Sequence, residues 1–470
     1  MPGKFRIEKD TLGEKPVPAE AYYGIQTLRA KENFPISGIL PKPVFIMATA
    51  IVKAASARAN MDLGLLDRRK GAAILRAAQE AAAGRLDKEF IVDVYQAGAG
   101  TSHNMNANEV IANRAIELLG GRKGGYDIVH PNDHVNMSQS TNDTMPTALR
   151  IAAFISSSDL MEALEGLTAE LEKKSKEFSK IIKSGRTHLQ DAVPVTLGAE
   201  FGSYAASVKS SAQKIKTTRD GLKKIGLGGT AVGTGLNTHP RYRATVLKML
   251  SNESGIKGLK KAPDRFEALN SMGDFTALSS ALRDLSVELI RIANDLRLLS
   301  SGPRTGLSEI SLPAVQPGSS IMPGKVNPVM AEMLDMVGFQ VMGNDLTVHL
   351  AAQAGQLELN VMLPVINYNL LQSIDILTAA IKAFTGKCVA GIKADERRCR
   401  RFFEDSVGLA TILNRLIGYE KAAQVAKESA LTGKTVKEIV IRKGILTEDE
   451  WERLLAPRAV TGPGVIGRRK

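Results

Sequence analysis

Three short segments of the chain gather side chains that could bind a small anion and move a proton. They are the polar run Ser138–Asp143, the interrupted pattern Ser184–Asp191 and the glycine-rich stretch Gly318–Pro328. Their chemically useful residues are Ser140, Thr141, Asn142, Thr187, His188, Ser319, Ser320, Lys325 and Asn327. Hydroxyl, amide and ammonium groups bind carboxylates, and an imidazole exchanges protons near neutral pH. The residues alone leave two interpretations open: separate caps and turns, or one polar pocket for a small carboxylate.

Three better-known signatures are present only in part. Gly226–Ala231 has the glycine spacing of a dinucleotide-binding loop, but it follows a lysine-rich amphipathic stretch rather than a strand. Gly318–Val326 resembles a phosphate-binding P-loop, but one residue too many separates the glycines and a valine stands where Ser or Thr should bind magnesium. His130 and His134 have the spacing of two metal ligands on a helix, yet a proline lies between them and no third ligand is evident. We therefore expect neither nucleotide binding nor a metal site.

Long amphipathic helices must position the three polar segments. Apolar residues recur at alternating intervals of four and three, which is the repeat of long helices packed in a bundle. The repeat is formed by Leu278, Leu282, Leu285, Leu289, Ile292, Leu296 and Leu299, and again by Leu370, Ile374, Leu377, Ile381 and Phe384. A third helical pattern covers residues 151–182, with Leu160, Leu164, Leu167 and Leu171 on one face. Strand patterns are short, as around Lys4–Glu8, so we expect a mainly α fold with a long helix bundle.

Glycine and proline indicate where these helices cannot continue. Gly120–Gly125 and His130–His134 predict loops before the first long helix, and Lys224–Pro240 predicts an irregular connection. The prolines between Ser301 and Pro328 exclude a helix there, so the third polar segment should be a loop that leads into a helix at Pro328. The apolar repeat ends near residues 386–395, and the rest of the chain predicts a small helical domain.

The composition is that of an ordinary globular protein with a basic surface. Of 470 residues, 62 are Lys or Arg and 49 are Asp or Glu, which gives a formal net charge of +13. Basic residues are not interleaved with aromatic ones, which favours a solvated surface or attraction of small anions over nucleic-acid binding. Two cysteines are too few for a disulfide framework, the N-terminus lacks the apolar run of a secretory signal, and no apolar stretch is long enough to span a membrane. We expect a cytoplasmic protein.

A family resemblance joins the three segments. Gly318–Pro328, with the sequence Gly-Ser-Ser-Ile-Met-Pro-Gly-Lys-Val-Asn-Pro, is similar to the signature loop of the aspartase/fumarase superfamily. The likeness continues in Asn104–Asn113, His130–Asn136, Gly185–Ala192 and Glu358–Val361, and so runs through nearly the whole chain. It implies a three-domain fold: an N-terminal domain at 1–141, a central long-helix bundle at 142–393 and a small C-terminal helical domain at 394–470. It also implies a homotetramer in which four copies share one bundle and each site draws on three of them.

Within the superfamily, the resemblance favours the aspartate ammonia-lyases over the class II fumarases. Tyr22–Ala30 lacks the Trp that fumarases usually carry after the first Tyr, and Ser140–Asn142 and Gly355–Met362 resemble the aspartase forms. His188 and Gly228–Asn237 point instead toward fumarases. The implied reaction is the reversible elimination of ammonia from L-aspartate to give fumarate. Interconversion of malate and fumarate is the alternative.

The resemblance also implies a role for each site residue. Ser319 would be the general base, and His188 would hold a carboxylate or modulate protonation. Carboxylate oxygens would be bound by Thr101, Ser140, Thr187, Ser320, Lys325 and Asn327, and the substrate ammonium by Thr141 and Asn142. No organic cofactor and no metal are implied. The expected partners are L-aspartate, fumarate, ammonia and further copies of the chain, without nucleic acid or membrane.

Overall fold

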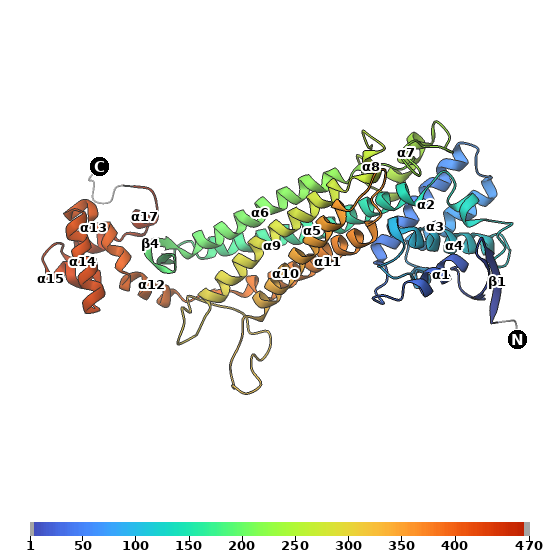
Figure 1. The fold of residues 1–470 in the computed structure, drawn as a ribbon. Helices are drawn as coiled ribbons and strands as arrows, with labels where there is room; N and C mark the ends of the chain where they lie inside the picture. The colour runs from blue at the N-terminus through green and yellow to red at the C-terminus, as the bar shows by residue number, and fades with distance from the viewer. Residues whose placement is uncertain (1–3, 465–470) are drawn as a thin grey trace. The chain divides into compact units, whose positions relative to one another are not determined.

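The computed structural model describes residues 4–464, and helices dominate it, as the apolar repeats predict (Figure 1). The helices are α1 (Ile25–Asn33), α2 (Pro43–Asp62), α3 (Arg68–Ala82), α4 (Thr101–Leu118), α5 (Thr141–Glu177), α6 (Leu197–Gly221), α7 (Tyr242–Ser254), α8 (Glu267–Asn270), α9 (Gly273–Leu299), α10 (Val329–Gln353), α11 (Leu363–Lys387), α12 (Glu396–Asp405), α13 (Ala410–Ile417), α14 (Tyr419–Thr432), α15 (Val436–Arg442), α16 (Glu448–Leu454) and α17 (Pro457–Val460). The prediction of a mainly α fold is confirmed.

Strands within residues 4–464 form only two-stranded sheets. The antiparallel pairs are β1 (Phe5–Asp10) with β2 (Gly13–Pro18), β3 (Ile182–Thr187) with β4 (Gln190–Thr196), and β7 (Ile310–Ser311) with β8 (Lys393–Ala394). The parallel pair is β5 (Lys224–Ile225) with β6 (Lys260–Lys261). The strand expected around Lys4–Glu8 is therefore present as β1.

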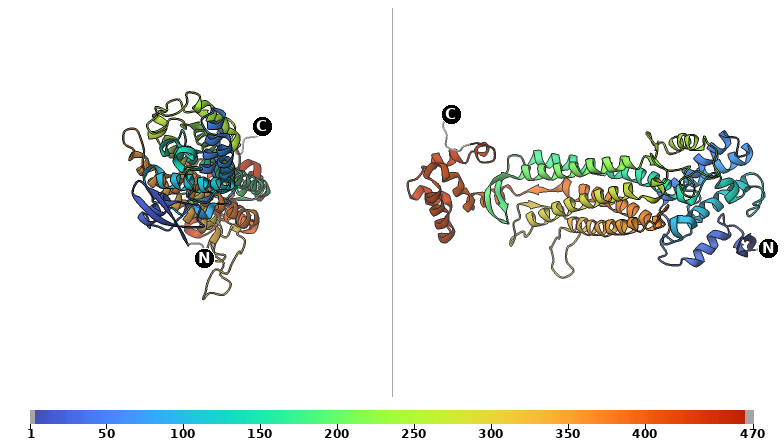
Figure 2. Two further views of the ribbon diagram at one scale, coloured as in Figure 1. Left: turned by 90° about the vertical axis from the view of Figure 1, so that its right-hand side faces the viewer. Right: turned by 45° about the horizontal axis from the view of Figure 1, so that its top comes forward.

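The chain divides into two compact units, each made of segments that are not consecutive in sequence. Unit 1 comprises residues up to Met161, Gln213–Ser286 and Phe339–Thr378, and unit 2 comprises Glu162–Ala212, Val287–Gly338 and the residues from Ala379 onward. The five long helices α5, α6, α9, α10 and α11 each contribute residues to both units. Within each unit their segments lie side by side (Figure 2).

The apolar repeats form the buried faces of the long helices. Every repeat residue predicted in α9 and α11 is buried, from Leu278 to Leu299 and from Leu370 to Phe384. Helix α5 also buries its predicted face, but it begins at Thr141 and ends at Glu177, where the sequence pattern suggested residues 151–182. The chain after α5 turns into strand β3 instead of continuing as a helix.

Each unit also has a core outside the long helices. In unit 1, α2 packs against α3 and α7, and α3 packs against α4, around a cluster that includes Ile74, Ile111 and Ile116. In unit 2, α12–α16 enclose the buried Trp451. Helices α15 and α16 both begin with a capping box, in which a Thr hydroxyl and a Glu carboxylate satisfy main-chain N–H groups reciprocally.

No helix among the described residues is long and apolar enough to cross a membrane. Cys388 and Cys399 are both free thiols and both buried.

Candidate active site

The two units divide the predicted site residues between them. Unit 1 contains Thr101, Ser140, Thr141 and Asn142. Unit 2 contains Thr187, His188, Ser319, Ser320, Lys325 and Asn327.

Ser140 and Asp143 close the N-terminus of α5. The Ser140 hydroxyl accepts a hydrogen bond from the Asn142 N–H at 3.2 Å, and the Asp143 carboxylate accepts one from the Ser140 N–H at 3.0 Å. This reciprocal pair resembles a capping box, with Asp in the place of Glu. One of the open interpretations, that the polar run caps a helix, therefore holds for these two residues. It does not account for Thr141 and Asn142.

Asp143 also fixes the glycine-rich connection that follows β5. Its second carboxylate oxygen accepts hydrogen bonds from the N–H groups of Gly228 and Thr230, each at 2.9 Å. Burial raises the pKa of the Asp143 carboxyl, while these main-chain donors and the nearby Lys53 oppose that shift. The adjacent Asn142 donates its amide N–H to the carbonyl of Ala231 at 2.7 Å. The amide oxygen of Asn142 is thereby left as an acceptor for another group.

Thr141 is held by polar groups from α2 and α4. Lys53 of α2 is fully buried, and its ammonium donates to the amide oxygens of Asn104, Asn136 and Gln139 at 2.7, 2.9 and 2.9 Å. The amide nitrogen of Asn104 then donates to the Thr141 hydroxyl oxygen at 3.1 Å. Burial lowers the pKa of Lys53 to about 7, and the charge of Asp143 opposes that effect.

Thr101 stands at the first position of α4, after a strained turn. Ala99 has a φ of 61°, which a residue with a side chain rarely adopts, and its N–H donates to the carbonyl of Val361 at 2.8 Å. A side chain at Gly98 would lie 3.0 Å from the Cβ of Val361, so glycine lets the turn approach Val361 closely. The Thr101 side chain is exposed, and its hydroxyl makes only a long contact of 3.3 Å with the Gly98 carbonyl.

Thr187 and His188 lie at the tip of the β3–β4 hairpin. The register joins Thr187 to Gln190, so His188 and Leu189 form a two-residue turn. Their φ values are 55° and 58°, which match the primed turns that fit hairpins but which His and Leu seldom adopt. Both side chains are exposed. The prediction that polar groups interrupt a helical pattern here is wrong, because the segment is a strand pair.

Ion pairs anchor this hairpin at its base. Lys183 in β3 is buried and contacts Glu200 at 2.9 Å and Glu309 at 2.6 Å. Arg186 contacts the other oxygen of Glu309 at 2.9 Å. Two cations around a fully buried carboxylate compensate its desolvation, and they attach the strand that carries Thr187 to the segment before the third polar loop.

The third polar loop holds Ser319 in a local turn. The Ser319 hydroxyl oxygen accepts hydrogen bonds from the main-chain N–H groups of Ile321 and Met322, at 3.2 and 2.9 Å. Two N–H donors aimed at one oxygen favour negative charge on that oxygen, as in an anion-binding nest. Ser320 and Lys325 are exposed, and Ser319 is half-buried.

The ends of this loop are bonded to each other. The Gly318 N–H donates to the Lys325 carbonyl at 2.8 Å, and the Asn327 amide donates to the Gly318 carbonyl at 2.6 Å. A side chain at Gly318 would lie 2.6 Å from the Lys325 carbonyl oxygen and 2.7 Å from the Asn327 nitrogen, so only glycine fits. An open depression of about 510 Å³ lies against the loop and is lined by Ser319 and Lys325 among others. As predicted, no helix crosses residues 301–328, and α10 begins directly after Pro328.

His130 and His134 have local structural roles. Pro131–Val135 forms a single π-helical turn, in which the His130 ring accepts hydrogen bonds from the N–H groups of Asn132 and Asp133. The His134 ring accepts one from the His130 N–H at 2.8 Å. Within residues 4–464, no group of three or more His, Cys, Asp or Glu side chains is arranged to hold a metal ion.

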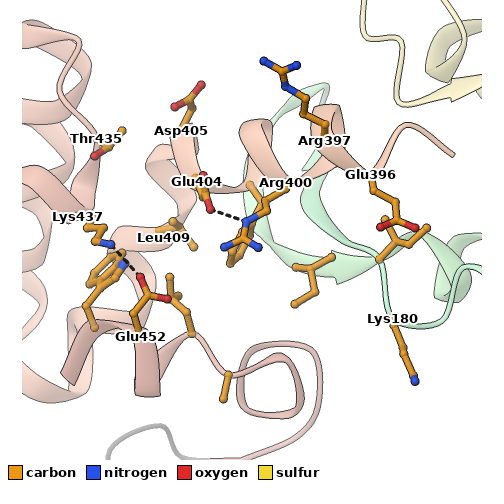
Figure 3. A pocket seen from close by; sticks show the side chains of 16 residues that line it. Lys180, Glu396, Arg397, Arg400, Glu404, Asp405, Leu409, Thr435, Lys437 and Glu452 are labelled. Carbon is orange, nitrogen blue, oxygen red and sulfur yellow. Dashed lines mark hydrogen bonds and ion pairs between the residues drawn. The ribbon is translucent and has the colours of Figure 1, made fainter. Parts of the chain in front are cut away.

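A larger cavity in unit 2 contains none of the predicted site residues. It measures about 810 Å³ and lies between residues 180–182 and the C-terminal helices (Figure 3). Its acidic and basic side chains are partly paired, Arg400 with Glu404 and Lys437 with Glu452, each at 2.8 Å. Paired charges of both signs leave no clear preference for a ligand.

Sequence reasoning missed three buried polar residues of the first group: Lys53, Asn104 and Asp143. Lys53 is the one charged residue in the apolar run from Phe45 to Ala57, but this position by itself does not indicate a role. Asn104 lies in a segment that the family resemblance covers, but no role was assigned to it. Asp143 was included in the polar run without a distinct function.

Comparison with known proteins places the chain in a family. A lyase family matches residues 13–343, and a family described as the fumarase C C-terminus matches residues 409–462. An aspartate ammonia-lyase from a Bacillus species is 52% identical over 464 residues, which cover 99% of each chain. A class II fumarate hydratase from Halobacterium salinarum is 50% identical, again over 99% of each chain.

Solved structures agree with this placement. A Brucella melitensis protein described as fumarate lyase:delta crystallin superposes with a TM-score of 0.95 at 49% identity, over 98% of this chain and 100% of that one. Both the sequence and the fold therefore match over nearly their full length. The chain belongs to the lyase family that includes aspartate ammonia-lyases and class II fumarate hydratases.

Proposed function

We propose that the protein is an aspartate ammonia-lyase, which converts L-aspartate reversibly to fumarate and ammonia. The carbon next to the β-carboxylate is a very weak acid, so removal of its proton needs a strong base. It also needs positive charge and hydrogen-bond donors around the carboxylate, which becomes a dianion. The C–N bond then breaks, and the amine leaves with its electron pair. The reaction needs no organic cofactor.

One observation carries the assignment of a serine base, which aspartase and fumarase chemistry share: the two main-chain N–H groups that donate to the Ser319 hydroxyl oxygen. A serine hydroxyl normally keeps its proton far above neutral pH, so a serine base requires a stabilised alkoxide. The N–H groups of Ile321 and Met322 supply such stabilisation without any movement of the loop. Lys325, which lines the same depression, adds a positive charge nearby. We therefore assign Ser319 as the general base.

The other candidate residues are assigned to substrate groups according to whether they donate or accept hydrogen bonds. Lys325 and Asn327, together with the hydroxyls of Thr101, Ser140, Thr187 and Ser320, are assigned to the carboxylate oxygens. Asn142 keeps a free amide oxygen, because its nitrogen is bound to Ala231, and this oxygen suits the substrate ammonium. Thr141 already accepts a bond from Asn104, so its own hydrogen is available to a carboxylate. A second lone pair of the Thr141 oxygen stays open to ammonium, but we assign the hydroxyl hydrogen to a carboxylate, in place of the ammonium that the family resemblance implies.

His188 is assigned to hold a substrate carboxylate or to modulate protonation. Its exposed ring stands in a two-residue turn whose positive φ values suit Asn or Gly better than His, and backbone strain of this kind concentrates at functional positions. One ring nitrogen of a neutral histidine donates a hydrogen bond and the other accepts one, so the ring can serve in either role.

A class II fumarase is the second candidate. A fumarate hydratase relative is 50% identical, close to the 52% of the aspartase relative. Both reactions share the carbanion and the fumarate product, so the base and the carboxylate site serve either. The two differ at the leaving group, and the free acceptor of Asn142 favours ammonium.

We further propose that four copies of the chain assemble around their long helices. On α10, Met336, Phe339, Leu346 and Leu350 are 63%, 59%, 61% and 53% exposed, and with Gly343 they repeat at intervals of three and four. Such a stripe left open on a long helix is typical of a bundle completed by other copies. The segments of both units would then be combined from different copies into each site.

Two further expectations accompany this assembly. The separate apolar clusters before residue 141 and after residue 394 support three domains, at 1–141, 142–393 and 394–470. Two free, buried thiols favour the cytoplasm. The partners would be L-aspartate, fumarate, ammonia and other copies, without nucleic acid or membrane.

Replacing the proposed base tests the function directly. We expect Ser319→Ala to lower kcat with L-aspartate by several orders of magnitude, as other nucleophile and base deletions do. Binding of L-aspartate should remain, because the carboxylate ligands are intact. Fumarate absorbance gives the rate and calorimetry gives the binding.

Ser179→Ala is the matched control. Ser179 is an exposed serine that donates to the Lys176 carbonyl at the end of α5, and its loss should leave the rate unchanged. Near-normal turnover by Ser319→Ala would contradict the assignment of the base.

A further inference from the structure

A fully buried lysine, Lys53, lies next to the polar segment Ser138–Asp143 and is bonded to it through Gln139. Lys53 lies in the middle of α2, and of the helix's twenty residues fourteen are buried. Its side chain is 0% exposed, its ammonium donates to three amide oxygens, and the charge of Asp143 acts on it without a direct ion pair. Burial of an unpaired ammonium is costly, so its three hydrogen bonds to amide oxygens are needed.

Those bonds determine how the neighbouring amides are oriented. A lysine ammonium only donates, so the oxygens of Asn104, Asn136 and Gln139 must face it. The nitrogen of Asn104 is therefore directed away from Lys53, toward the Thr141 hydroxyl at 3.1 Å and the Asn136 oxygen at 3.3 Å. With this orientation fixed, the Thr141 oxygen is an acceptor for Asn104.

The same ammonium also controls the main chain just before Ser140. Gln139 is bound to Lys53 through its oxygen and donates its amide nitrogen to the carbonyls of Val135 at 3.0 Å and Met137 at 3.2 Å. Asn136, the third ligand, donates to the Gln139 carbonyl at 3.4 Å. The segment Asn136–Gln139, which precedes Ser140, is thus held in place by hydrogen bonds around the Lys53 ammonium.

We propose that Lys53 is a positioning residue for substrate binding, which acts through Asn104 to direct the Thr141 hydroxyl proton toward a substrate carboxylate. This inference rests on the proposed function, because it takes Thr141 as a residue of the substrate site. Lys53 itself touches no reacting atom. Through Asn104 it leaves the Thr141 hydroxyl free to donate to substrate. Through Gln139 it fixes the position of Ser140 relative to Thr141.

A purely structural lysine would act differently on catalysis. If Lys53 only filled the core, its removal would reduce stability and would lower activity independently of Thr141. If it acts through Thr141, removing Lys53 should matter little once the Thr141 hydroxyl is gone. A double-mutant cycle separates these cases, because coupled residues give non-additive effects.

The cycle uses Lys53→Met, Thr141→Val and the double variant. Methionine keeps the length of the buried side chain, and valine keeps the shape of threonine. We expect each single variant to lower kcat/KM by about tenfold or more, since small misplacements of binding groups are expensive. The kcat/KM of the double variant should lie within about threefold of that of Thr141→Val alone. If the two residues acted independently, their losses of kcat/KM would multiply.

Two further variants keep the test decisive. Asn104→Asp retains an acceptor for Lys53 but loses the N–H that reaches Thr141, so it should show the same non-additivity with Thr141→Val even if Lys53→Met folds poorly. Lys174→Met is the matched control: Lys174 is also buried and donates to the Ile392 carbonyl at 2.8 Å and to Glu177 at 2.9 Å. It should lower the Tm and leave kcat/KM within about twofold of wild type.

The cycle is run with whichever of L-aspartate and L-malate the wild type converts. Conversion of malate alone would contradict the proposed function and still allow the cycle to be read. Multiplying losses in the double variants, or a kcat/KM for Lys53→Met within twofold of wild type, would overturn the role of Lys53.

Discussion

Individual side chains in α4 show how burial decides what a polar group does. His103 is buried between Phe45 and Phe90, with ring centroids 4.7 and 5.5 Å away. Thr49 donates its hydroxyl to the Phe45 carbonyl at 2.8 Å, so at its 3.1 Å contact with the His103 Nε2 it must be the acceptor. The ring is thereby held as the neutral Nε2–H tautomer. Desolvation, with a smaller effect from Lys53, lowers the pKa of His103 to about 3.

This shift predicts that acid destabilises the protein through His103. In the unfolded chain the ring has its ordinary pKa of 6.5, so between about 6.5 and about 3 only the unfolded state binds the proton. The stability contributed by neutral His103 is complete above pH 6.5 and is lost as the pH falls toward 3. Over that window, wild type should lose about 1.4 kcal/mol per pH unit relative to His103→Gln, which cannot titrate.

Thermal unfolding of both proteins from pH 7 to pH 4 measures this difference. A constant difference in Tm between wild type and His103→Gln across that range would contradict the neutral, desolvated ring.

Candidate site residues in recognisable segments could be named from the sequence, whereas the groups that hold them could not. Ser319, Lys325 and Asn327 belong to one continuous motif, so the sequence alone indicates them. Lys53 is separated from Thr141 by a long stretch of chain and stands in an alanine-rich helix, where a single lysine usually indicates an exposed position. Only the folded structure shows that its ammonium is enclosed by three amides.

At the scale of elements, regular helices were predictable and the hairpin was not. The repeats of α9 and α11 directly express which residues are buried, and the structure buries all of them. The β3–β4 turn consists of His188 and Leu189, where sequence rules expect Asn or Gly. A turn that violates its usual chemistry gives no local signal, and this agrees with a functional reason for the histidine.

Helix α10 supports a prediction about assembly. Its exposed residues Phe339 and Leu346 lie one heptad apart on the stripe that other copies would cover. Glutamates introduced at these two positions would face the same glutamates of other copies and repel them. We expect wild type to scatter light as a tetramer and Phe339→Glu/Leu346→Glu to dissociate and lose activity.

The control is Leu431→Glu, which alters an apolar residue of α14 that is 76% exposed and lies outside the long helices. A wild-type monomer, or a double variant that keeps the wild-type mass, would contradict the assembly.

At the scale of the whole molecule, the sequence predicts domains made of consecutive residues. The structure instead has compact units made of separate segments. The two compact units combine segments from before residue 162, from the middle and from the later part of the chain, because five long helices pass through both. Local patterns locate where helices begin and end, but they do not indicate which distant segments pack together. The predicted three-domain division at residues 141 and 393 stays a prediction.

The central claim, that this chain eliminates ammonia from L-aspartate, is tested most directly by offering the purified protein L-aspartate and L-malate in separate reactions. Fumarate is followed by its ultraviolet absorbance, and ammonia is measured in parallel. We predict that fumarate and ammonia appear in equal amounts from L-aspartate and that no fumarate appears from L-malate. Fumarate formed from L-malate alone would contradict the account.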